Sequence, residues 1–182
     1  MSESQVKVTN LDNGIRVVSD TMNSVESVSL GAWFGIGTRN ESADVNGVAH
    51  LLEHMAFKGT NGRSAAAIAE EVEHVGGHLN AYTSREQTAY YAKFLKGDMS
   101  LGVDILSDIL QNSIFAELEL DRERNVVLQE IGQCADTPDD IIFDYFQSTA
   151  YPDQGLGRPV LGTGEIISKM SRDTVIKFIN DN

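Results

Sequence analysis

Two histidines and a glutamate stand at a spacing that suits metal chemistry. His50 and His54 are four residues apart, and Glu53 lies between them in the order His-x-x-Glu-His. If this segment is helical, both rings lie on one face and reach a single ion, with the carboxylate close by. A pair of imidazoles on a helix suits zinc, and a nearby glutamate that is not a ligand can take a proton from a zinc-bound water. The alternative is an exposed helix that carries these residues without a function.

A catalytic zinc site normally has three protein ligands and keeps a fourth position for water, so a further ligand is needed. Glu130, 76 positions after His54, is the best candidate. Glu123 precedes it by two turns of a strongly helical stretch, so both carboxylates should lie along one helix face. Val126 and Val127 stand between the two glutamates, which predicts that this face is buried. The alternative is a solvated acidic face, which most glutamate-rich helices present.

Five segments give the chain its resemblance to a known family. They are residues 10–18, 47–60, 76–84, 123–130 and 157–162. The chain resembles the pitrilysin-type (inverzincin) zinc metallopeptidases, and within them the branch of the mitochondrial processing peptidase β-subunit and its bacterial counterparts. The family motif, His-x-x-Glu-His followed by a glutamate about 76 positions on, has no substituted position here.

The resemblance implies a role for each residue of the motif. His50, His54 and Glu130 would bind one Zn²⁺ ion, Glu53 would be the catalytic base, and Glu123 would complete the catalytic site from behind the ligands. The implied activity is that of a zinc-dependent endopeptidase, which hydrolyses peptides or presequence-like segments by Glu-assisted attack of a zinc-bound water. Two alternatives remain open: a non-catalytic, peptidase-like structural subunit, and a peptide-binding module. The intact motif speaks against the first, and an absent zinc would favour the second.

Residues 78–84 and 87–95 are expected to form an antiparallel pair of strands. The resemblance implies that the first of them is an edge strand near the zinc, which pairs with an extended substrate. It therefore gives a substrate-binding role to the middle of that strand, namely Asn80, Ala81, Tyr82 and Thr83. The alternative is an ordinary strand with one polar face.

The remaining patterns predict an α+β fold in which an antiparallel or mixed sheet packs against helices, because strands and helices segregate without regular alternation. Asn13-Gly14 is the strongest hairpin signal, Ser64 is a helix cap, and Gly76 ends that helix. Further strands are expected at residues 5–11, 15–19 and 27–35. Helices are expected at residues 45–57, 64–75, 98–111, 118–133, 138–150 and 171–179.

At 182 residues the chain is long enough for one domain with one core. The resemblance implies that residues 1–182 form the N-terminal half-domain of a larger peptidase, truncated before its last strand. We expect such a fragment to have little activity alone. Its open sheet edge should pair with a neighbouring copy or be covered by its own N-terminal segment.

The net charge of −13 argues against nucleic acid and anionic membranes as partners. A basic peptide substrate fits this charge, although solubility alone also explains it. The resemblance adds two further partners, the missing C-terminal half and, in some members, a partner subunit. Cys134 is the only cysteine, which excludes an internal disulfide and indicates a reducing compartment. With no visible signal peptide or membrane span, we expect a bacterial cytoplasmic protein, or one of the mitochondrial matrix after removal of a transit peptide.

Two histidines and a glycine-rich segment remain outside this chemistry. His74 is expected at the surface, and no spacing makes His78 a ligand. The segment 155–164 lacks the Lys-Ser/Thr ending of a phosphate loop, so we interpret it as a structural loop. Its Arg158 is placed to hold neighbouring carbonyls or carboxylates.

Overall fold

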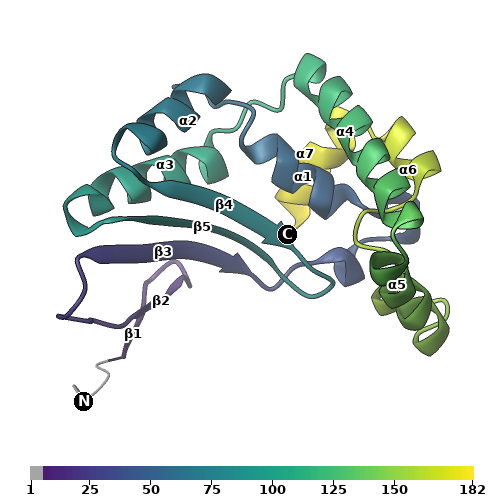
Figure 1. Ribbon diagram of the computed structural model, residues 1–182, viewed down its shortest axis with the longest axis horizontal. Coiled ribbons are helices and arrows are strands. Elements are labelled where there is room, and N and C mark those ends of the chain that lie inside the picture. Colours follow the sequence, from purple (N-terminus) through teal and green to yellow (C-terminus); the bar gives the residue numbers. More distant parts are fainter. Residues whose placement is uncertain (1–5) are drawn as a thin grey trace.

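The computed structural model describes residues 6–182, in which a small sheet lies beside a group of helices (Figure 1). Helices α2 and α3 cover one face of the sheet, and the other helices gather at one end of it. The expected α+β class is confirmed. Residue 5, the start of the first expected strand, lies outside the described range.

The main sheet has three antiparallel strands in the order β3 (Ser27–Phe34), β5 (Thr88–Leu95) and β4 (His78–Thr83). In its register Leu79 of β4 lies opposite Ala92 of β5. The expected antiparallel pair is therefore confirmed. Within the described residues β4 is an edge strand, with one side of its backbone outside the sheet.

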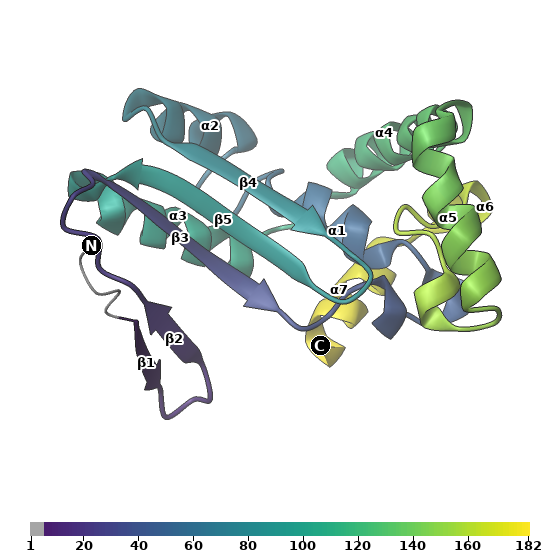
Figure 2. The same ribbon diagram turned by 60° about the horizontal axis from the view of Figure 1, so that its bottom comes forward.

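The first two strands form a separate hairpin, β1 (Lys7–Asn10) and β2 (Arg16–Ser19), which lies apart from the main sheet (Figure 2). Its turn follows the expected chemistry: Gly14 has φ +89°, and the Asn13 side chain accepts a hydrogen bond from the amide of Ile15 at 3.1 Å. All residues of both strands are exposed. Residues 7–19 thus pair with one another and do not join the main sheet.

The helices follow the predicted order, with one addition. They are α1 (Val48–Ala56), α2 (Ala65–His74), α3 (Met99–Gln111), α4 (Glu117–Asp136), α5 (Pro138–Ala150), α6 (Gly164–Lys169) and α7 (Arg172–Asp181). Ser64 caps α2 as predicted, since its side chain accepts from the amide of Ala67. Short α6 was not predicted; Thr163 caps it in the same way.

The motif helix is shorter than predicted, because residues 43–45 form a separate 3₁₀ turn before α1. Thr137 stands at the predicted cap of α5, but its hydroxyl donates back to the carbonyl of Gln133 and does not cap the helix. Pro138 occupies the first turn of α5, where its missing amide costs nothing.

Two hydrophobic cores lie on either side of α1. The first joins α2 and α3 to the sheet and consists of Ala56, Ile68, Val72, Ala81, Tyr90, Ala92, Phe94, Ile105, Leu106 and Ile109. The second joins α1, α4, α6 and α7 and consists of Val48, Leu51, Met55, Leu120, Val127, Ile167, Met170 and Val175. Helix α1, which carries the His-x-x-Glu-His motif, contributes to both and is fixed by them.

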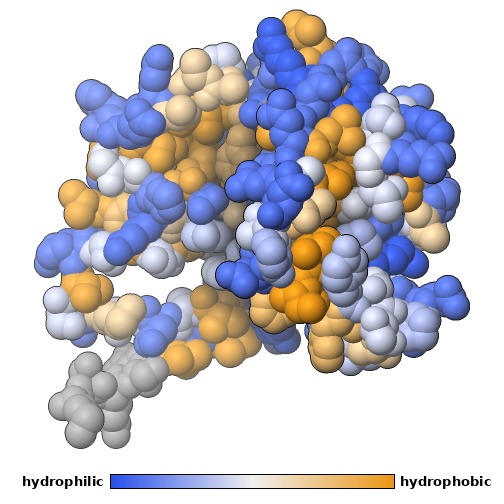
Figure 3. Space-filling model, turned by 45° about the vertical axis from the view of Figure 1, so that its right-hand side comes forward, coloured by the Kyte–Doolittle hydropathy of each residue, from blue (hydrophilic) through white to orange (hydrophobic). Residues whose placement is uncertain are grey.

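Helix α5 contributes no buried residue. Its large side chains Ile142, Phe143, Tyr145 and Phe146 are exposed. Figure 3 shows apolar side chains among polar ones on this side of the molecule.

Candidate metal centre

The first turn of α1 is capped from a distance by Glu41. Gly47, the residue just before the helix, has φ +96° and no side chain to act as a cap. The Glu41 carboxylate accepts hydrogen bonds of 2.8 Å each from the amides of Gly47 and Ala49 and from the side-chain amide of Asn46. A carboxylate satisfies free amides at this end of a helix and interacts favourably with the helix dipole. Glu41 is only 4% exposed, and burial raises its pKa even though these bonds act in the other direction.

The glycine-rich segment supports this cap from behind. Arg158 donates a hydrogen bond to the backbone carbonyl of Glu41, which confirms that this arginine holds a neighbouring carbonyl. The side chain of Asn46 also donates to the carbonyl of Pro159 at 3.1 Å. Gly162 has φ +74°, and a Cβ there would lie 2.4 Å from the carbonyl oxygen of Asn46. The segment is therefore a structural support for the start of α1.

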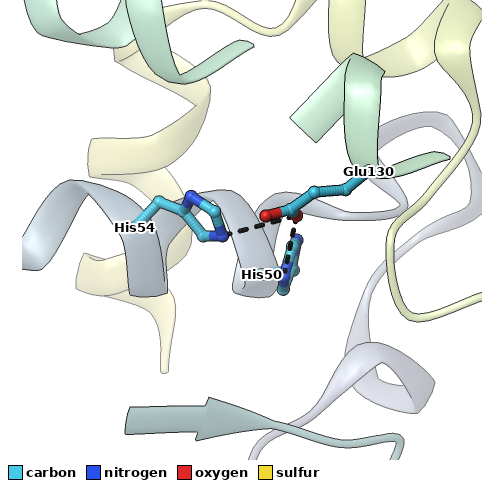
Figure 4. Close-up of side chains that lie close together, drawn as sticks. All are labelled: His50, His54 and Glu130. Atoms are coloured by element: carbon cyan, nitrogen blue, oxygen red, sulfur yellow. Dashed lines mark ion pairs between the residues drawn. The ribbon is translucent and has the colours of Figure 1, made fainter. Parts of the chain in front are cut away.

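His50, His54 and Glu130, called here the metal trio, converge on one point (Figure 4). The two rings come from successive turns of α1, with centroids 4.7 Å apart, and the carboxylate comes from α4. Glu130 Oε2 lies 3.8 Å from His50 Nε2 and 3.6 Å from His54 Nε2. Ligands about 2.0–2.2 Å from a tetrahedral zinc stand about 3.4 Å from one another, so the spacing in the trio is close to that of a zinc site.

The electrostatics of His50 also fit a metal ligand. Burial, with a smaller effect of His54, lowers the pKa of His50 to about 4. Its ring is therefore neutral at neutral pH and has a lone pair to give to a metal. Two imidazole nitrogens and one carboxylate oxygen, all within 4.8 Å of one another, form the ligand set that zinc takes in hydrolytic enzymes. The residues present thus fit zinc.

Glu53 lies beside the trio and does not belong to it. Its pKa is raised, first by burial and further by the charge of Glu130, against a hydrogen bond from Thr83 and the charge of His54. Its Oε2 is buried and has no hydrogen-bond partner among the described residues. A carboxylate with a raised pKa and a free oxygen is suited to accept a proton from a water.

Glu123 lies behind His54. Its Oε2 is 3.0 Å from His54 Nδ1, and its Oε1 is 2.7 Å from Lys58 Nζ. The structure therefore brings both predicted glutamates of α4 to the motif helix. Glu130 lies beside the Nε2 atoms of His50 and His54, and Glu123 lies beside Nδ1 of His54. Glu123 as a residue is 6% exposed, so its carboxylate contacts these groups in a largely dry environment.

The predicted burial of two valines on α4 is wrong for one of them. Val127 is fully buried, but Val126 is 39% exposed. The buried stripe of α4 runs through Leu120, Glu123 and Val127. Val126 precedes Val127 by one position, about 100° around the helix, and therefore lies at the margin of the stripe.

The four residues predicted to bind substrate divide between the two faces of β4. Ala81 is buried and Thr83 points toward α1 and Glu53, whereas Asn80 and Tyr82 are exposed. The Tyr82 hydroxyl accepts from the side chain of Gln87 at 2.7 Å. Asn80 and Tyr82 therefore offer exposed side chains, whereas Ala81 and Thr83 offer mainly backbone groups, of which the Ala81 amide already donates to Asn80 Oδ1 at 2.9 Å.

The contacts of Glu41 and Lys58 with the motif helix and with Glu123 were not predicted from the sequence. Lys58 stands one turn after His54, so helical spacing points to it. Glu41 is tied to α1 through a loop, and no spacing rule reveals it. His74 and His78 are exposed and are not part of the trio.

A His-x-x-Glu-His helix beside a glutamate of a second helix is the arrangement typical of the inverted zincins. The insulinase family (peptidase family M16) matches residues 16–164, and the chain belongs to this family. The expected family of zinc-dependent proteases is thereby confirmed.

Two relatives and one solved structure illustrate the similarity. The chain is 43% identical over 179 residues to a probable mitochondrial-processing peptidase subunit beta of Arabidopsis thaliana, covering 98% of this chain and 34% of that protein. It is 44% identical over 173 residues to an uncharacterized zinc protease of Rickettsia felis, covering 95% of this chain and 42% of that protein. The crystal structure of a protease from Helicobacter pylori superposes with a TM-score of 0.91 at 26% identity, covering 96% of this chain and 42% of that one. The chain thus spans about a third to two-fifths of the length of these proteins.

None of the helices within residues 6–182 is long and apolar enough to cross a membrane.

Proposed function

We propose that residues 1–182 form the half-domain that carries the metal site of a zinc-dependent endopeptidase. One observation carries the proposal: the donor atoms of His50, His54 and Glu130, from two helices, lie within 4.8 Å of one another beside the partly buried Glu53. Membership of the insulinase family supports the same activity.

The proposed roles follow from the geometry. His50, His54 and Glu130 would hold a Zn²⁺ ion, which when bound would lower the pKa of a water from about 15.7 toward about 7 and polarise a substrate carbonyl. Glu53, through its unpartnered Oε2, would accept a proton from a water and deliver it to the leaving amine. Its raised pKa makes it a better proton acceptor than an exposed glutamate. Glu123 orients the ring of His54 through Nδ1.

The proposed substrate is a peptide in extended conformation. Edge strand β4 offers free backbone groups next to Glu53, so a peptide can add to the sheet there. In this arrangement Ala81 and Thr83 act through their backbone groups on the open side of β4, and Asn80 and Tyr82 act through their side chains. The net charge of −13 favours a basic, presequence-like peptide.

The whole activity is proposed for a longer protein. The relatives are more than twice as long as this chain, and the first is named a subunit. Additional donors for the oxyanion and a second wall of the substrate site would come from such additional parts, and a partner subunit is compatible with them. A reducing compartment, the bacterial cytoplasm or the mitochondrial matrix, suits a chain with the single Cys134.

The test separates the base from the ligands in the full-length protein. Glu53→Gln should lower cleavage of a fluorogenic basic peptide by about 10²–10⁴-fold while zinc content stays near that of the unchanged protein. His50→Ala should lose zinc and activity together. Glu73→Gln, on the exposed face of α2, is the matched control and should change neither.

If Glu53→Gln lost as much zinc as His50→Ala, the role of Glu53 as a base and not a ligand would be misassigned. Full cleavage by Glu53→Gln would remove the proposed mechanism. Peptide binding without any cleavage, in protein that contains zinc, would favour a peptide-binding module.

A further inference from the structure

A lysine is connected to the metal trio through a buried carboxylate. Lys58 Nζ lies 2.7 Å from Glu123 Oε1, and Glu123 Oε2 lies 3.0 Å from His54 Nδ1. The ring of His54 then presents Nε2 to Glu130 at 3.6 Å. The four side chains thus form a series that begins just after α1 at Lys58, crosses to Glu123 of α4, returns to His54 of α1 and ends at Glu130 of α4.

Each oxygen of Glu123 has one partner, and this fixes the plane of the carboxylate. A carboxylate held at only one oxygen can turn about its last torsion, which is broad for glutamate. With the ammonium group of Lys58 on Oε1, the other oxygen is directed at His54 Nδ1. A carboxylate at this nitrogen selects the tautomer with the proton on Nδ1, which leaves the lone pair on Nε2 for a metal.

Because Glu123 is buried, its negative charge needs the positive charge of Lys58 beside it. Glu123 is almost fully buried, and a buried carboxylate without a compensating charge is costly. Lys58 itself is only partly exposed, and its backbone amide donates to the carbonyl of Met55 at the end of α1. It therefore moves with the helix that carries both histidines.

On the assumption of the proposed zinc site, we propose that Lys58 is a positioning residue of the metal centre. It holds the carboxylate of Glu123 in the orientation that fixes the ring and the tautomer of His54. Lys58 does not touch the metal or the substrate, so its effect should appear first in metal binding.

The test measures zinc affinity by competition with a chromogenic chelator, and ligand geometry by the visible spectrum of the cobalt-substituted protein. Lys58→Met should weaken zinc binding by about 10-fold or more, the range found for groups that orient metal ligands, and should alter the cobalt spectrum. Lys58→Arg keeps the charge and should bind zinc within about 3-fold of the unchanged protein, since removing an orienting group costs more than this. Lys169→Met is the matched control, because it breaks an exposed ion pair with Glu165 in α6, and it should change neither measurement.

A double variant tests whether Lys58 acts through Glu123. Glu123→Gln should weaken zinc binding, and adding Lys58→Met to it should weaken binding by less than about 2-fold further, because residues that act in series are not additive. Fully additive effects, or an unchanged affinity and cobalt spectrum in Lys58→Met, would overturn the proposal. If Lys58→Met does not fold, Lys58→Gln is judged by the same criteria.

His50→Ala separates this proposal from the proposed function. If it leaves zinc affinity unchanged, the zinc site itself is wrong. If it abolishes binding while Lys58→Met has no effect, only the role of Lys58 is refuted.

Discussion

Removal of the Glu41 carboxylate should destabilise the protein strongly, although the residue lies in a loop. Glu41 accepts three buried hydrogen bonds of 2.8 Å, from the amides of Gly47 and Ala49 and from the side chain of Asn46. In Glu41→Ala these donors lose their acceptor at the first turn of α1, where no local side chain can replace it. The start of the motif helix would be left with unsatisfied amides.

The size of the effect follows from these contacts. A buried donor left without a partner costs about 1–3 kcal/mol, so three of them set an upper range of about 3–9 kcal/mol. The expected loss of stability is smaller than this upper range for two reasons. Burial raises the pKa of Glu41, which means that burying its charged carboxylate already costs free energy in the unchanged protein. In addition, water can enter the space that alanine leaves and accept the free hydrogen bonds. We expect Glu41→Ala to lower the free energy of unfolding by about 3–5 kcal/mol.

Urea denaturation followed by circular dichroism measures this value as a shift of the midpoint at constant slope. Glu41→Gln keeps the shape and one acceptor oxygen, so its loss should be smaller, about 1–3 kcal/mol. Glu86→Ala is the control, because it removes an exposed ion-pair partner of Arg39 and should cost less than about 1 kcal/mol. A loss in Glu41→Ala no larger than that in Glu86→Ala would refute the account of α1 capping.

Two further predictions concern His50 and Gly162. In metal-free protein the pKa of His50 is about 4, below the ordinary 6.5, so between these values the unfolded chain binds a proton that the folded chain does not. Stability should therefore fall by up to about 3 kcal/mol as the pH drops from 6.5 to 4, and His50→Ala should abolish this dependence; an equal slope in both proteins would contradict it. Gly162→Ala should lower the free energy of unfolding by about 2–4 kcal/mol in thermal denaturation, because it combines φ +74° with a backbone contact of 2.4 Å. Gly132→Ala, in α4 with no atom near its Cβ position, is the control and should be neutral or stabilising.

Local signals in the sequence were sufficient for most elements. Asn13-Gly14, Ser64 and Pro138 act through their own turns and first helical turns, so the hairpin, α2 and α5 could be predicted. Helix α6 was missed because Gly162 and Gly164 surround its cap, Thr163, and glycine normally marks a loop. The hydroxyl of Thr163 caps this helix in the folded chain, but a lone threonine between two glycines does not predict a helix from sequence.

The candidate site was predictable to the extent that it lies on one helix. His50 and His54 share a face through spacing alone, whereas Glu130 could be named only as a candidate, because its approach to the two rings depends on how α4 packs against α1. The roles of Glu41 and Lys58 depend on contacts with other segments, which no pattern along the chain contains. Val126 shows the same limit, since its exposure depends on which side of α4 meets α1.

The sharing of α1 between two cores has a consequence for how the protein opens. Ala56 belongs to the core under the sheet, and Val48, Leu51 and Met55 belong to the core with α4, α6 and α7. A fluctuation that loosens one core leaves α1 held by the other, so partial opening does not release this helix. Its amides should exchange with solvent only when the whole fold unfolds, and more slowly than those of the exposed hairpin or of α5. The histidines would then keep their mutual geometry while the rest of the molecule fluctuates around them.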